Sequence, residues 1–224
     1  MTHLDIEIKR LKDEAAEMFE LVISQLRKAR TALLSFDKDM ASEVTFNEKR
    51  VNALELKIDK DCENIFALMN PVAIDLRFVL AVLKINSNLE RIGDIADGIA
   101  RYVSQSETWF DKDLLEVTRL SEMFDIAIQM LNDSKTSFES EDTKLARGVF
   151  KKDDQLDEIN GDANSVVEVY IKNHPDKIQQ CLHIISSIRK LERTGDQVKN
   201  VAEEIIFYIE AKVLKHVSAE KKGD

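Results

Sequence analysis

The sequence contains little of the two residues that most often interrupt regular structure, with six glycines and two prolines among 224 residues. Proline breaks the interior of a helix and glycine weakens it, so a chain poor in both favours long, uninterrupted helices. Apolar residues make up 44% of the chain and charged residues 33%. This balance excludes a disordered chain and is typical of long helices in a folded protein.

Basic residues are also in deficit. The chain has 32 Lys and Arg against 42 Asp and Glu, which gives a formal net charge of −10 at pH 7. Nucleic-acid binding relies on a basic face that neutralises phosphates, and no such stretch is concentrated in this sequence. A nucleic-acid partner is therefore disfavoured, whereas metal ions or a basic partner surface suit the chain better.

Long hydrophobic runs are absent as well. The longest apolar stretches are far too short to cross a bilayer, and residues 1–7 lack the basic and then apolar pattern of a secretory signal. We therefore expect a cytoplasmic protein without membrane insertion.

What the chain does contain is an internal repeat. Residues 89–94, with the sequence LERIGD, return at 191–196 as LERTGD, so five of six residues are identical. A single Glu-x-x-x-Asp pair means little among 42 acidic residues, but chance does not supply it twice in identical surroundings. Residues 17–19 likewise return at 122–124. The halves correspond over most of their length, which predicts a tandem duplication.

The two cysteines do not follow this repeat. Cys62 and Cys181 occupy different parts of the two halves, so a duplicated disulfide or metal pair is not expected. Both thiols are expected to be reduced and partly buried.

Each half divides into three helical patterns, in which apolar residues recur at three- and four-residue steps. Proline favours the first turn of a helix over its interior, so Pro71 and Pro175 are expected to mark chain reversals. They fall between the second and third helix of each half. Asp39, and Asp142 or Ser140, are the expected N-caps of the second and fifth helices. The helices are expected at 4–36, 40–69, 73–104, 112–139, 142–172 and 176–213.

Helices of this length joined by short turns run antiparallel, and three of them enclose one apolar seam. We therefore expect an all-α fold of two tandem antiparallel three-helix bundles, one in residues 1–107 and the other in 108–224. On the third helix the seam comprises Ile85, Leu89, Ile92, Ala96, Ile99 and Val103. On the sixth helix it comprises Ile184, Ile188, Leu191, Val198, Ala202 and Ile205.

Gly93 and Gly195 lie inside these helices, where glycine costs about 1 kcal/mol relative to alanine. Two explanations stay open at this point. Either a neighbouring helix approaches closely, or the glycines keep side-chain bulk away from whatever the flanking acids bind.

The repeated acids are expected to face away from the core. Measured around the helix from Ile92, Glu90 and Asp94 lie about 160° away on either side, and Asp97 about 140° away. Glu192 and Asp196 likewise lie toward the flank or outer face of their helix. This argues against a buried dinuclear site of the ferritin type, which uses inward Glu residues and Glu-x-x-His motifs. No histidine of this chain has a Glu three residues before it.

A second acidic turn on the preceding helix favours a surface metal site. Asp153 and Asp157 lie four residues apart, and the corresponding first-half residues are Glu48 and Asn52. If these helices are neighbours, oxygen-bearing side chains converge in one groove of each half, which is unfavourable unless a cation neutralises them. Such ligands suit Mg, Mn or ferric iron, and zinc through carboxylates. The ordinary alternative is a solvated acidic face paired with nearby cations, namely Arg91, Arg101 and Arg193.

The paired Leu-Glu-Arg-x-Gly-Asp segments, residues 71–77 (PVAIDLR) and the duplicated layout together resemble the PhoU family, the regulatory accessory proteins of bacterial phosphate uptake. The resemblance implies two bundles related by pseudo-twofold symmetry, commonly a homodimer, and Glu/Asp-x-x-x-Asp motifs that bind metal at the bundle surface. Asn52 departs from the acidic pattern, so the first site looks the weaker. The residues expected to bind metal are Glu48, Glu90, Asp94, Asp153, Asp157, Glu192 and Asp196.

The resemblance also implies a function. Members of the family hold phosphate signalling off when phosphate is plentiful, through the ATP-binding subunit of the phosphate ABC transporter and the phosphate-sensing histidine kinase. The sequence has no phosphate-cradling glycine loop and no nucleophile with an evident base, so we expect a non-enzymatic regulator. A metal-free helical adaptor and a carboxylate-bridged metalloenzyme are the alternatives.

Overall fold

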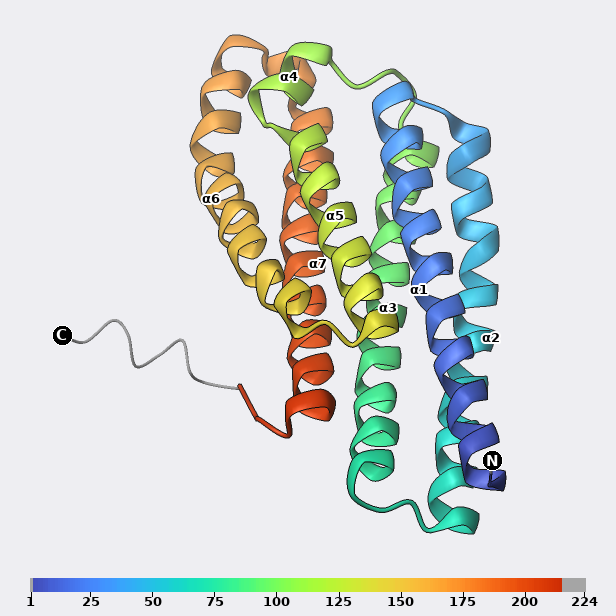
Figure 1. Cartoon of the computed structure of the whole chain (residues 1–224). Coiled ribbons are helices and arrows are strands. Elements are labelled where there is room, and N and C mark those ends of the chain that lie inside the picture. Colours follow the sequence, from blue (N-terminus) through green and yellow to red (C-terminus); the bar gives the residue numbers. More distant parts are fainter. Residues whose placement is uncertain (1, 215–224) are drawn as a thin grey trace, which may run out of the picture.

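The computed structural model describes residues 2–214, and all regular elements within this range are helices. The long helices lie side by side along one axis (Figure 1). In chain order the elements are α1 (His3–Ser35), α2 (Lys38–Met69), α3 (Ala73–Gln105), α4 (Lys112–Val117), α5 (Leu120–Ser140), α6 (Thr143–Asn173), the 3₁₀ turn η1 (Pro175–Lys177) and α7 (Ile178–Glu210). The expected all-α class is confirmed.

The long helices form two three-helix bundles. One comprises α1, α2 and α3 and the other α5, α6 and α7, and each helix contacts both others of its bundle. Contacts of α3 with α7 and of α1 with α5 join the bundles, and α2 and α6 lie on opposite flanks (Figure 1). The expected pair of bundles related by pseudo-twofold symmetry is thus confirmed. The proposed division between residues 107 and 108 falls in the segment that links α3 to α4.

The core follows the apolar seams expected on α3 and α7, whose twelve residues are all fully buried. Aromatic side chains from both halves meet where the bundles join. Phe19 of α1 packs against Phe138 of α5 with ring centroids 5.7 Å apart, and Phe78 of α3 packs against Tyr208 of α7 at 5.4 Å. Each such ring contributes roughly 1.5–3 kcal/mol when buried, so the two bundles stabilise one another.

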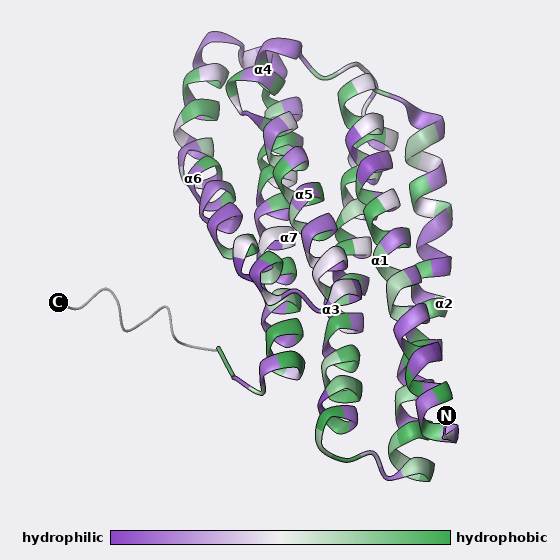
Figure 2. Ribbon diagram, viewed as in Figure 1, coloured by the Kyte–Doolittle hydropathy of each residue, from purple (hydrophilic) through white to green (hydrophobic). Residues whose placement is uncertain are grey.

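Hydrophilic and hydrophobic residues alternate around most helices, as the mixed colours of Figure 2 show. This is the pattern of helices with one face toward a core and another toward water. Within residues 2–214, no helix is both long enough and apolar enough to cross a bilayer. Cys62 and Cys181 are both free and fully buried, which is deeper than the partial burial expected from the sequence.

The helix expected at 112–139 is broken into two, which the sequence did not predict. Arg119 has a left-handed backbone, with φ 53°, and no glycine or proline marks the position. The buried Thr118 hydroxyl donates to the carbonyl oxygen of Leu114 at 2.7 Å and helps to end α4. A side chain that hydrogen-bonds to the preceding turn offers the backbone an alternative to continuing the helix.

The helix caps agree only in part with expectation. Asp142 caps α6 by accepting from the Lys144 N–H at 2.9 Å, as expected. The cap of α2 is Asp37, which accepts from the Met40 N–H at 2.8 Å, so the expectation of Asp39 was wrong by two residues. The C-cap of α1, Phe36, has a left-handed backbone with φ 51°, so the chain turns there and α2 begins two residues earlier than expected.

The two glycines of the repeated motif lie where helices approach closely. A Cβ at Gly195 would lie 2.6 Å from Leu156 Cδ1 and 2.7 Å from Asp153 Oδ1, both on α6. A Cβ at Gly93 would lie 3.0 Å from its nearest neighbour on α2 and 3.4 Å from Glu48 Oε2. The first explanation is therefore confirmed, because the neighbouring helix comes close at both glycines, and it presents a carboxylate at the point of approach. The second explanation, that the glycines leave room for a bound group, stays a prediction.

We predict opposite effects of alanine at two glycines. Gly161 is exposed on α6 and a Cβ there would meet nothing within 4 Å, so Gly161→Ala should raise the free energy of unfolding by about 1 kcal/mol. Gly195→Ala should lower it, because overpacking costs about 1–3 kcal/mol and outweighs the helix gain. Urea unfolding followed by circular dichroism measures both. Equal stabilisation by the two substitutions would show that α7 and α6 are not in close contact at Gly195.

Candidate functional site

The first carboxylate cluster is centred on Glu48 of α2, which is only 8% exposed. Neither of its carboxylate oxygens has a hydrogen-bond donor among the described residues. The pKa of Glu48 is raised to about 7, first by burial and then by the carboxylates of Asp94, Asp97 and Glu90 on α3. The structure therefore brings together the three first-half residues expected to bind metal, Glu48, Glu90 and Asp94.

The orientation expected for the acids of α3 is right for two of them and wrong for the third. Asp94 is exposed and Glu90 is half-buried, so both lie away from the core. Asp97 is only 7% exposed, which contradicts its expected outward position. The reason is that α3 contacts α1, α2 and α7, and little of its circumference faces solvent. Asp97 Oδ2 accepts from Arg101 Nε at 2.6 Å, while its Oδ1 has no hydrogen-bond partner in the described part of the chain.

Glu55 also belongs to this cluster, although the sequence reasoning missed it. Burial raises the pKa of Glu55, and the carboxylates of Asp59 and Asp94 add to the effect. The signal was available, because residues seven apart lie on the same face of a helix and Glu55 follows Glu48 by that interval. Asn52, between them, is exposed.

The second cluster is centred on Asp153 of α6, which is 3% exposed. Burial raises the pKa of Asp153, although its ion pair with Lys199 opposes the effect. Burial also raises the pKa of Glu192, followed by the carboxylates of Asp196, Asp157 and Asp153. All four second-half residues expected to bind metal therefore lie close enough to interact.

Lys199 of α7 is the residue of the second cluster that the sequence reasoning missed. Its Nζ donates to a carboxylate oxygen of Asp153 and, at 2.8 Å, to Asp196 Oδ1. Burial alone would lower the pKa of Lys199, but the hydrogen bonds to the two aspartates outweigh burial and raise it. The side chain therefore remains a cation held between α6 and α7. The sequence could have indicated this contact, because Lys199 follows Asp196 by three residues and residues at that spacing are neighbours on a helix.

The donor set of both clusters fits a hard cation, but the side chains are not gathered around one point. Within residues 2–214, no group of three or more His, Cys, Asp and Glu is arranged so that it could hold a metal ion. The exposed members, above all Asp94 and Asp157, would have to change rotamer to complete a site. The buried Glu48 carboxylate, which has no donor, supports the fit in the first half.

The arginines expected to neutralise the acidic faces behave differently from one another. Arg101 pairs with Asp97 as expected. Arg91 and Arg193 line a cavity of about 380 Å³ between α3 and α7, together with Lys190. Asp94 lines the same cavity, but within the described residues neither Arg91 nor Arg193 forms an ion pair shorter than 4 Å.

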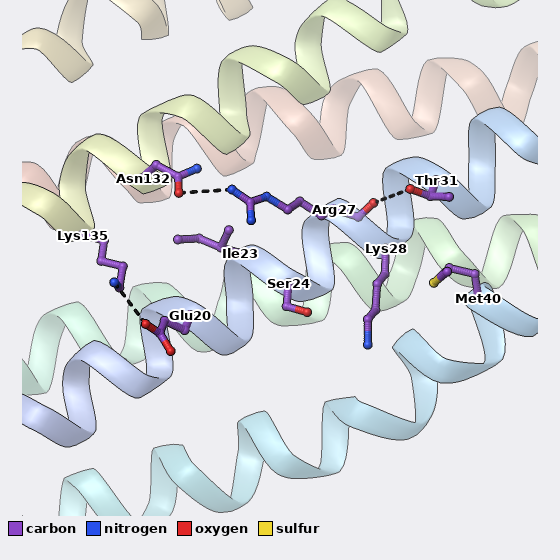
Figure 3. Close-up of a pocket in the computed structure, with 9 residues that line it drawn as sticks. All are labelled: Glu20, Ile23, Ser24, Arg27, Lys28, Thr31, Met40, Asn132 and Lys135. Atoms are coloured by element: carbon purple, nitrogen blue, oxygen red, sulfur yellow. Dashed lines mark hydrogen bonds and ion pairs between the residues drawn. The ribbon is translucent and has the colours of Figure 1, made fainter.

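A larger cavity, of about 550 Å³, lies beside α1 and α5 (Figure 3). It is lined by several basic side chains, but these already have partners. Lys135 pairs with Glu20 at 3.2 Å and Arg27 donates to the Asn132 side-chain oxygen at 3.3 Å, as the dashed lines of Figure 3 show. Lys28 pairs with Glu43. These internal pairs leave the carboxylate clusters as the better candidates for a functional site.

Two of the histidines pack against aromatic rings. The His183 ring lies 5.0 Å from that of Tyr102, and the His174 ring lies 4.5 Å from that of Tyr170. His3 is exposed at the start of α1. His216 lies outside the described residues.

The raised pKa of Glu48 predicts a pH-dependent stability. An acid that ionises less readily when folded destabilises the fold as pH rises from its unfolded pKa, 4.5, to its folded pKa, about 7. Relative to Glu48→Gln, the wild-type free energy of unfolding should therefore fall across this range by at most about 3 kcal/mol. Urea unfolding of both proteins in the presence of a chelator measures the difference. A difference independent of pH would show that Glu48 is not buried beside like charges.

Comparison with known proteins places both bundles in one family. Residues 15–103 and 120–205 each match the model of the PhoU domain. The phosphate-specific transport system accessory protein PhoU homolog of Aquifex aeolicus is 33% identical over 97% of this chain and 98% of its own length. The phosphate-specific transport system accessory protein PhoU of Escherichia coli is 30% identical over 96% of this chain and 88% of its own.

Solved structures agree with this result. The crystal structure of PhoU from Pseudomonas aeruginosa matches with a TM-score of 0.87 at 29% identity, over 94% of this chain and all of that one. The phosphate transport system regulatory protein PhoU from Streptococcus pneumoniae matches with a TM-score of 0.82 at 27% identity, over 95% of this chain. Since the family model matches both repeats and the relatives span nearly the full length, the chain belongs to the PhoU family of accessory proteins of phosphate transport.

Proposed function

We propose that the protein is a non-enzymatic negative regulator of phosphate uptake and of phosphate-responsive signalling. The match of both bundles to the family of phosphate-transport accessory proteins is the observation that carries this proposal. In this role the protein acts in the cytoplasm as a homodimer. It docks onto the ATP-binding subunit of the phosphate ABC transporter and onto the phosphate-sensing histidine kinase.

Metal binding at the carboxylate clusters is part of the proposal. In the first half, Glu48, Glu90 and Asp94 would hold a cation. In the second half, the ligands would be drawn from Asp153, Asp157, Glu192 and Asp196. Carboxylate oxygens favour hard ions such as Mg, Mn or ferric iron, and zinc is also bound through carboxylates. A bound cation would neutralise the acids of two adjacent helices and change the charge of a surface that a partner meets.

The position of the clusters supports docking over catalysis. Each cluster lies between an outer and an inner helix of one bundle, with exposed members such as Asp94 and Asp157. A partner can reach such a surface directly. The ferritin-type metalloenzyme remains the weakest candidate, because the chain lacks the Glu-x-x-His motif that such a site uses.

A metal-free adaptor is the second candidate, and Lys199 favours it. The ammonium of Lys199 already neutralises two carboxylates of the second cluster without a metal. In such an adaptor the exposed acids meet basic residues of the partner directly. Charge complementarity of this kind sets specificity and association rate.

The proposal predicts which proteins the chain recovers from cells. A tagged wild-type protein expressed in its own host at high phosphate should co-purify with subunits of the phosphate transporter, identified by mass spectrometry. Asp94→Lys reverses an exposed charge of the first cluster and should reduce that recovery about tenfold. Reproducible absence of transporter subunits from the wild-type sample would overturn the proposed role.

A matched control and a chelator arm separate the two candidates. Glu63→Lys reverses an exposed charge on the same α2 helix as Glu48 but about 22 Å further along it, so recovery should match wild type. Recovery that falls when a chelator is present supports the metal-dependent regulator. Recovery that resists the chelator and still falls with Asp94→Lys supports the metal-free adaptor.

A further inference from the structure

The two halves of the chain differ at a pair of positions, one helical turn apart, that matters for both clusters. Equivalent residues of α3 and α7 are 102 apart in the sequence, as Gly93 and Gly195 show. By the same interval Lys199 stands where the first half has Asp97. Residue Glu203 in turn stands where the first half has Arg101. An acidic residue followed one turn later by a basic one has thus become a basic residue followed by an acidic one.

The inverted pair makes different contacts in the two halves. Arg101 has a side chain that is 59% exposed, and it reaches back along its own helix to Asp97. Lys199 has a side chain that is 31% exposed, and it reaches across to Asp153 on α6 as well as to Asp196 on α7. The cation of the second half therefore joins two helices, whereas that of the first half stays on one.

The consequence appears at the central buried acid of each cluster. Asp153 accepts a hydrogen bond from the Lys199 ammonium. Glu48, which occupies the equivalent place beside Gly93, has no donor on either oxygen among the described residues. A buried carboxylate without a donor is costly, and the nearest cation of the first cluster, Arg101, donates its hydrogen bond to Asp97 and none to Glu48. Within the part of the chain that the structure describes, the central acid of the first cluster therefore lacks the bonded cation that the central acid of the second already has.

We propose that Lys199 is the resident cation of the second carboxylate cluster, so that a divalent metal binds at the first cluster, around Glu48, and is excluded from the second. This inference rests on the proposed metal-binding function and assigns that function to one half of the chain. A metal in the second cluster would have to displace two charge-assisted hydrogen bonds of Lys199. It would also bring a double positive charge close to the ammonium.

This assignment reverses the expectation drawn from Asn52. Because Asn52 has an amide where the second half has a carboxylate, the sequence pointed to a weaker first site. That expectation considered only residues that could be metal ligands. The first cluster has additional acids in Glu55 and Asp97, and its cation, Arg101, bonds only to Asp97 among the described residues. In the second cluster Lys199 bonds to the central acid Asp153 and to Asp196. Counting charges of both signs therefore favours the first half.

Wild-type protein can test the assignment without any substitution. Paramagnetic Mn²⁺ broadens amide signals near its binding site, and the equivalent Gly93 and Gly195 report on the two clusters. Substoichiometric Mn²⁺ should broaden the Gly93 amide and leave the Gly195 amide sharp. Equal broadening of both, or broadening at Gly195 alone, would overturn the inference while leaving the proposed metal binding intact.

Variants then test the role of Lys199 itself. Lys199→Gln removes the charge but keeps a donor for Asp153, and it should add a second Mn²⁺ equivalent when free Mn²⁺ is counted by electron paramagnetic resonance. Adding Asp196→Asn to that variant should abolish the second equivalent. Lys199→Arg retains the cation and should add no site. Circular dichroism verifies that each variant is folded, and Lys199→Ser replaces Lys199→Gln if the latter is not.

Glu48→Gln completes the experiment and separates the two possible failures. In the wild-type background it should weaken Mn²⁺ binding about tenfold or more, and in the Lys199→Gln background it should leave the second equivalent. No added equivalent in Lys199→Gln, while wild type binds Mn²⁺, overturns the role of Lys199. No Mn²⁺ binding by wild type or by Lys199→Gln overturns the proposed metal binding itself.

Discussion

The close approach of an outer helix to an inner helix, at Gly93 in one bundle and Gly195 in the other, is the constraint on which both clusters depend. The missing side chain lets α2 and α6 come near enough to place Glu48 and Asp153 against the inner helix. An acid in that position is largely removed from water, and its charge is then costly unless something neutralises it. The raised pKa of Glu48 expresses that cost directly. The glycine of the motif therefore allows the neighbouring helix to pack closely beside the flanking acids. This close packing offsets the cost of a glycine inside a helix.

The two halves of the duplicated chain differ in how the charge of the buried acid is neutralised. Both halves kept the glycine, the Glu-x-x-x-Asp pair and a buried acid from the neighbouring helix. They differ one turn further along, where Lys199 stands in place of Asp97. A lysine is a flexible cation with three donors, and it can reach between helices where an aspartate only adds to the repulsion. One bundle thus contains its counter-charge within its own sequence, while the other leaves Glu48 without a donor among the described residues.

The periodicity of a helix correctly predicted which of its faces is buried. It failed for residues whose exposure or contacts depend on neighbouring helices. The seams of α3 and α7 were predicted because each buried face is written in the spacing of its own residues. Asp97 was misplaced because an angle from the seam does not say how many helices surround α3, and three of them do. Lys199 was missed because a search for ligands selects acids, whereas an electrostatic cluster is defined by both signs. The break at Arg119 was invisible because neither glycine nor proline marks it.

The arrangement of charges bears on how such a protein meets its partners. Aromatic rings from both halves, Phe19, Phe78, Phe138 and Tyr208, and the ion pair of Lys84 with Glu204 hold the two bundles against each other. Each carboxylate cluster is centred between an outer and an inner helix, and of the cluster residues only Asp94 also lines the cavity between α3 and α7. The motif arginines Arg91 and Arg193 line this same cavity. The buried acids Glu48 and Asp153 therefore lie within the bundles, between an outer and an inner helix, while the motif arginines lie at the junction. Neutralising a cluster changes the charge of a docking surface while the aromatic contacts between the bundles stay intact.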